Sequence, residues 1–106
     1  MTYELITTGV VTSSAGIPSR YSLSQNYPDP FNPTTNIEFT VPSDGHAILK
    51  IYNALGQVVA TLFKDEADAG SVHQIQFNGS NLASGTYFSR LEFGGKMQVK
   101  KMLLLK

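Results

Sequence analysis

Hydrophobic and polar residues alternate through much of the chain after residue 35, with the period of two that is typical of half-buried β-strands. Ile37, Phe39 and Val41, for example, stand between polar neighbours. Together with a short apolar run near residue 21, the pattern predicts about seven strands. We expect these strands at residues 21–23, 36–41, 46–52, 57–64, 72–77, 86–93 and 97–105. Short strands at this spacing predict an all-β fold, an antiparallel β-sandwich.

Glycines mark the turns between these segments. Gly56 ends a connection over residues 53–56 and suits the positive φ that a hairpin into the next strand requires. The pair Gly94-Gly95 predicts a tight hairpin turn of the primed type. Residues 65–70 are polar and are expected to form a loop.

A helix is the alternative for residues 54–62, where the apolar residues also have helical spacing. The β-branched residues in this segment, together with Gly56, favour the strand.

Three prolines within residues 27–33 set this segment apart from the rest of the chain. Proline fixes φ and lacks a backbone N–H, and it drives the preceding residue toward extended geometry. The segment is therefore expected to be a stiff, extended strap, and its two aromatic rings are expected to pack onto the sandwich. We call it the proline strap; its structural residues are Tyr27, Pro28, Pro30, Phe31, Asn32 and Pro33.

Length and composition indicate one globular domain. The 106 residues suffice for a single modest core, and an apolar content of 42% fits an ordered chain. Residues 1–17 are polar and are expected to be a linker or the tail of a preceding domain, which leaves residues 18–106 as the domain. No segment has the roughly 18 consecutive apolar residues of a transmembrane helix. The N-terminus also lacks a signal-peptide pattern, so a signal for export would belong to a longer precursor.

Candidate chemistry is sparse. The eight basic and eight acidic residues cancel, and aromatic residues do not interleave with basic ones, so nucleic acid is not an expected partner. His46 and His73 lack metal-ligand spacing, and without cysteine there is neither a disulfide nor a thiolate site. The acidic residues Asp65, Glu66 and Asp68 lack the calcium-loop framework, which leaves a solvated turn or a weak cation site. We therefore expect no catalytic residue, no cofactor and no metal.

The C-terminal end is locally basic, because residues 96–106 carry four lysines and no acid. Lysines often protect edge strands against unwanted strand pairing. A receptor that reads a basic, extended C-terminal strand is the other interpretation, and the residues alone leave both open.

Four segments resemble one known family and occur in its order. They are Tyr21–Ile37 (YSLSQNYPDPFNPTTNI), Leu49–Val59 (LKIYNALGQVV), Leu82–Phe88 (LASGTYF) and Lys100–Lys106 (KKMLLLK). Over about residues 18–106 the chain resembles the C-terminal sorting domain of the type IX secretion system of Bacteroidetes and related bacteria. Asp29 stands where the family usually has asparagine, and both residues suit turns.

The resemblance implies an Ig-like sandwich that serves as a non-enzymatic export signal. It implies passage through the periplasm, recognition by the outer-membrane secretion machinery and removal by a surface sortase, with a cargo domain N-terminal to this chain. The cleavage site would lie before the domain, near residues 10–17. The resemblance also implies that export depends on the late motifs, which here contain Gly85, Tyr87, Lys100, Lys101 and Lys106. The alternative function is a structural or adhesive Ig-like module of a cell-surface or flagellar-hook-type protein, because the same fold serves both.

Overall fold

A computed structural model describes residues 2–3, 5–6 and 20–106. The predicted linker and cleavage segment therefore lie almost entirely outside the described residues. The two-residue strands β1 (Thr2–Tyr3) and β2 (Leu5–Ile6) pair with each other. The other seven described strands are β3 (Ser22–Leu23), β4 (Thr34–Thr40), β5 (Gly45–Asn53), β6 (Val58–Ala67), β7 (His73–Asn78), β8 (Gly85–Phe93) and β9 (Lys96–Leu104).

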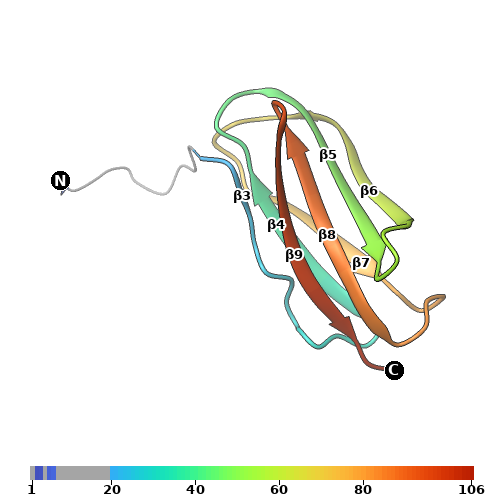
Figure 1. Ribbon diagram of the computed structural model, residues 1–106. Coiled ribbons are helices and arrows are strands. Elements are labelled where there is room, and N and C mark those ends of the chain that lie inside the picture. Colours follow the sequence, from blue (N-terminus) through green and yellow to red (C-terminus); the bar gives the residue numbers. More distant parts are fainter. Residues whose placement is uncertain (1, 4, 7–19) are drawn as a thin grey trace.

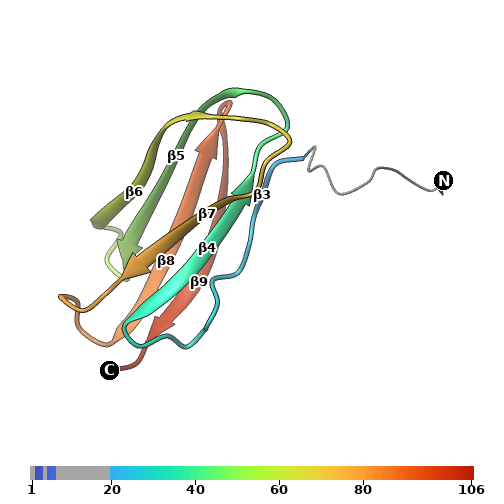
Figure 2. The same cartoon turned by 180° about the vertical axis from the view of Figure 1, so that it is seen from behind.

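These seven strands form two antiparallel sheets that pack face to face (Figures 1 and 2). One sheet has the order β3-β4-β7, and the other has the order β6-β5-β8-β9. No helix occurs among residues 20–106. The all-β, Ig-like sandwich predicted from the sequence is thus confirmed.

Alternation along the strands places the core between the sheets. Ala47, Leu49 and Ile51 on β5 are fully buried, whereas the residues between them face outward. The remaining buried apolar side chains come from both sheets and the strap: Leu23, Phe31, Ile37, Phe39, Val41, Ala67, Phe77, Tyr87, Leu91, Met102 and Leu104. At about 25 cal/mol per Å² of apolar surface removed from water, this core provides the main stabilisation of a chain that has no disulfide.

The turns lie where the sequence predicted them, and the end of one strand differs from the prediction. Gly94 and Gly95 have φ of 59° and 79°, the two positive values of a type I′ hairpin turn between β8 and β9. The segment that also had helical spacing, residues 54–62, forms the turn after β5 and then the start of β6 from Val58 onward. Asp65 and Glu66, however, lie within β6 and not in a loop, because pairing with β5 continues as far as Ala67, which is fully buried.

Candidate functional site

The C-terminal strand β9 lies at the edge of the four-stranded sheet and pairs with β8 along its whole length. Met102 and Leu104 face the core and are almost completely buried. This end of the strand is thus fixed to the sandwich by apolar packing, which leaves its outer face and its edge to be considered for recognition.

The three candidate lysines of this strand do not form one cluster. Lys101 is exposed opposite Phe88, on the outer face of the sheet. Lys100 is half-buried opposite Ser89, in the row that faces the other sheet, and Ser89 is 1% exposed. Adjacent residues in a strand point to opposite faces, so a single surface cannot contact both side chains in the same way.

Lys106 is held by the loop before β8. Its backbone N–H donates to Ser84 Oγ at 3.0 Å, and its Nζ donates to the Ser80 carbonyl at 2.7 Å. These bonds fix the chain end against residues 80–84, the segment that leads into the family motif around Gly85.

Gly85 and Tyr87 have evident structural roles. Gly85 has φ of +153°, a conformation that side chains rarely adopt. The Tyr87 ring is buried, and its hydroxyl donates to the Ala83 carbonyl at 2.7 Å. A tyrosine that bonds to the backbone a few residues upstream at the start of this strand is the tyrosine corner of Ig-like sandwiches.

The residues before the proline strap are anchored to β4 by a small polar cluster. The Asn26 side chain, 2% exposed, donates to Thr35 Oγ1 and to the Pro28 carbonyl. Thr35, 1% exposed, also donates from its hydroxyl to the same carbonyl at 2.8 Å. The buried polar atoms therefore satisfy one another, and they hold the start of the strap at a fixed position.

The two aromatic side chains of the strap differ in burial. Phe31 is 1% exposed and packs in the core beside Phe77, as predicted. Tyr27 is 79% exposed, so the prediction that it packs onto the sandwich is wrong. Its backbone exchanges two hydrogen bonds with Asn36, and residues paired in this way share a face, which here is the solvent face.

The rest of the strap is exposed at Pro28, Pro30 and Asn32 and half-buried at Pro33. The Pro33 carbonyl accepts a hydrogen bond from the Gly79 N–H at 2.8 Å and so ties the strap to the loop after β7. The bonds before all three strap prolines are cis.

The strap and the residues before it cover the free edge of β9. Gln25 Nε2 donates to the Lys101 carbonyl at 2.7 Å, and Asp29 Oδ1 accepts from the Leu103 N–H at 3.0 Å. The Phe31 backbone bonds to the Leu103 carbonyl and to the Leu105 N–H. Between residues 101 and 105 this edge is therefore already hydrogen-bonded within the domain. No period or motif in the sequence identified Gln25 or Asp29 as residues that cover this edge.

The residues considered for other chemistry remain apart. His46 is exposed near Glu66, and His73 stacks on Phe39 with ring centroids 4.8 Å apart. His73 is thus packed against the core and is not a freely solvated strand histidine. Within the described residues, no group of three or more His, Asp or Glu side chains has the arrangement of a metal site. The described part of the chain also holds no helix that is long and apolar enough to cross a membrane.

Comparison with known proteins identifies the family. The model of the secretion system C-terminal sorting domain matches residues 25–105, which include the strap, the β8 motif and β9. No curated protein matched the chain significantly. The family match spans most of the domain, and the fold is the sandwich that the resemblance implied. The chain therefore belongs to the family of C-terminal sorting domains of the type IX secretion system.

Proposed function

We propose that this domain is a non-enzymatic export signal, carried at the C-terminal side of a cargo and recognised by outer-membrane components of the type IX machinery. The domain passes through the periplasm in folded form and is removed by a surface sortase during export to the cell surface. The observation that carries the proposal is the family match across residues 25–105, together with an ordered, lysine-bearing β9.

Two routes of recognition at β9 are possible in principle, strand addition to its edge and charge pairing with its lysines. Strand addition would have to displace the Gln25, Asp29 and Phe31 contacts that cover the edge at residues 101–105. Charge pairing with Lys101 needs no rearrangement, because its side chain is exposed on the outer face. The geometry favours charge pairing with an acidic receptor surface.

A reporter assay tests this function. Residues 18–106 are fused to the C-terminus of a reporter that carries its own signal peptide, in a host with the type IX system, and the surface-exposed reporter is measured. The fused reporter is expected to reach the surface, and the reporter without the domain is not. Surface levels equal to those of the unfused reporter would leave the domain as a structural or adhesive module.

The lysines are tested in the same assay. Changing Lys100, Lys101 and Lys106 together to glutamine is expected to reduce export without unfolding the domain, since none of the three is in the core and the one side-chain bond lost, from Lys106 Nζ to the Ser80 carbonyl, lies at the surface. The control keeps the three positive charges at the same positions: Lys100→Arg, Lys101→Arg and Lys106→Arg together, which should be exported like the unchanged domain. Equal export of the two triple variants would show that the C-terminal lysines protect the edge and are not read by a receptor.

A further inference from the structure

The solvent-facing side of the four-stranded sheet combines positive charge with apolar surface. Strand register places Tyr52 beside Phe88, and Phe88 beside Lys101. The next row runs from Lys50 through Arg90 to Val99. We call these side chains the outer face: Lys50, Tyr52, Phe88, Arg90, Val99 and Lys101.

The charges of the outer face are poorly balanced. Lys50 and Arg90 are direct cross-strand partners, an arrangement of like charges that disfavours the sheet by itself. The Arg90 guanidinium lies 4.4 Å from the centre of the Tyr52 ring and pairs with the Glu92 carboxylate. Glu92 can neutralise one of the cations, so this face keeps a net positive charge although the chain as a whole has none.

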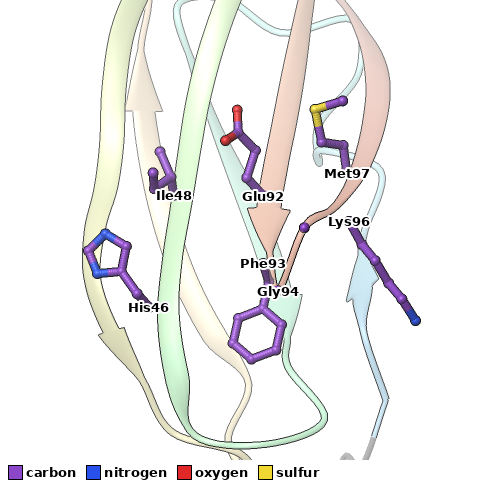
Figure 3. Close-up of a pocket in the computed structure, with 8 residues that line it drawn as sticks. His46, Ile48, Glu92, Phe93, Gly94, Lys96 and Met97 are labelled. Carbon is purple, nitrogen blue, oxygen red and sulfur yellow. The ribbon is translucent and has the colours of Figure 1, made fainter.

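Apolar surface lies directly beside these charges. A shallow hollow is lined by Tyr52, Phe88, Arg90 and Val99 together with the turn after β5, and Val99 is 53% exposed. A second hollow continues along the same sheet toward the β8–β9 turn, between Ile48 and Met97 (Figure 3). In the centre of a protein interface, arginine and aromatic side chains contribute most of the binding energy.

We propose that the outer face is the surface by which the secretion machinery recognises the domain, and that its partner is an acidic protein surface with an apolar centre. This proposal rests on the proposed function and extends it, because Lys101 is both one of the β9 lysines proposed to contact the receptor and a member of the outer face. A second copy of the domain is a poor occupant. A two-fold contact would bring Lys50, Arg90 and Lys101 of the two copies together, and like charges across an interface oppose binding.

The experiment uses two substitutions at Val99, an exposed position of the outer face on the edge strand β9. Val99→Glu and Val99→Lys both remove the same apolar side chain, but they add opposite charges. Binding of each purified 106-residue chain to outer-membrane fragments from a bacterium with the type IX system is measured by co-sedimentation at low and moderate salt. A thermal melt of each variant establishes that it is folded.

We expect Val99→Glu to weaken binding about tenfold or more relative to Val99→Lys, with a difference that shrinks as salt rises. The double variant Lys50→Gln/Arg90→Gln is expected to weaken binding as well. Arg20→Gln/Lys100→Gln is the control that also removes two positive charges, because Arg20 lies before β3 and Lys100 lies in the row that faces the other sheet. It should bind like the unchanged chain.

Several results would overturn the proposal. Equal binding of the two Val99 variants, with the unchanged chain bound and its reporter exported, would reject the outer face and leave the proposed function standing. Absence of both binding and export for the unchanged chain would reject the two together. Binding that survives protease treatment of the fragments and is competed by purified lipopolysaccharide would identify a glycan. Concentration-dependent dimers that Val99→Glu abolishes would identify a second copy as the occupant.

Discussion

The carboxylate of Asp29 accepts a hydrogen bond from the backbone N–H of Leu103, across 74 residues of sequence. The other Asp29 oxygen accepts from Gln25 Nε2, which also donates to the Lys101 carbonyl. Two exposed side chains thus bind polar groups of the β9 edge that would otherwise face water. An edge strand with free polar groups is a template for unwanted pairing, and covering it protects the domain. The family motif that begins near Tyr21 therefore supports the motif at the C-terminus physically.

Asp29 offers a test of this cover. Asp29→Ala removes the acceptor and is expected to lower the free energy of unfolding by about 0.5–1.5 kcal/mol. Asp29→Asn keeps the oxygen that accepts from the Leu103 N–H but replaces the one that accepts from Gln25 Nε2 with an amide donor, so its cost should be smaller than that of alanine. Hydrogen exchange of the Leu103 amide reports directly on the bond, and it should accelerate in the alanine variant alone. Unchanged exchange in that variant would mean that the amide is protected by something other than Asp29.

Phe31 is expected to be the main apolar anchor of the strap. Truncating a buried phenylalanine to alanine costs about 3–5 kcal/mol, so Phe31→Ala should lower the melting temperature clearly. Tyr27→Ala is the matched control, because this ring is 79% exposed, and it should change stability by no more than about 0.5 kcal/mol. Thermal and urea unfolding measure both. Similar losses in the two variants would contradict the assignment of Phe31 as the anchor.

The environment of Tyr21 is expected to make the folded state less stable at alkaline pH. Its hydroxyl donates to the Leu91 carbonyl. Burial raises the pKa of Tyr21 above its ordinary value of 10.0, and the nearby Glu92 charge adds to this, while a backbone hydrogen bond at Gln98 acts in the opposite direction. A raised pKa means that the folded state favours the neutral phenol. This contribution is complete below pH 10 and is lost as the pH rises through the higher pKa of the folded state.

Comparison of the unchanged chain with Tyr21→Phe isolates this effect. The variant should be less stable at neutral pH by about 0.5–1.5 kcal/mol, the usual net worth of one hydrogen bond. Above pH 10 the gap should narrow, because phenylalanine does not ionise. Urea unfolding at several pH values measures the gap, and a constant gap from pH 7 to pH 11 would show that Tyr21 does not titrate differently in the two states.

Gly85 is expected to act through the backbone. Placing alanine at its φ of +153° should cost about 1–3 kcal/mol, although no other atom lies within 4 Å of the added carbon. Export of a Gly85→Ala reporter should follow the folded fraction of the domain. A folded variant that is not exported would instead make Gly85 part of a contact surface.

Lys100 and Lys101 should differ in their effect on export. Lys101→Gln removes an exposed charge from the outer face and should account for most of the loss of export that is expected for the triple variant. Lys100→Gln acts on the opposite side of the strand, opposite Ser89, and should leave export nearly unchanged. Both single variants should keep the melting temperature of the parent. A larger export defect for Lys100→Gln would place the receptor contact at the rim between the two sheets.

The sequence by itself determined the fold class and most of the strands. Alternation at Ile37, Phe39 and Val41 was sufficient to predict a strand. Side chains in a strand point alternately to opposite faces, so a strand with one buried face has apolar residues at every second position. The Gly94-Gly95 turn was equally clear, since positive φ at both positions is accessible mainly to glycine. The strap was found from its three prolines and the late motif residues by family resemblance, whereas the backbone and packing roles of the late motif residues emerged only from the structure.

Only the tertiary structure decided which strap aromatic is buried and which groups cover β9. The prolines predicted an extended strap, whereas the structure bends the chain at residues 28–30 and 32–33. The prolines also do not say which face of the strap meets the core. That choice depends on the Tyr27–Asn36 pairing, which turns Tyr27 outward, and on a core position beside Phe77 that accepts Phe31. The bonds from Gln25 and Asp29 to β9 join residues more than 70 positions apart. Local sequence pattern encodes local conformation, whereas such contacts depend on how distant segments are brought together by the packing of the two sheets.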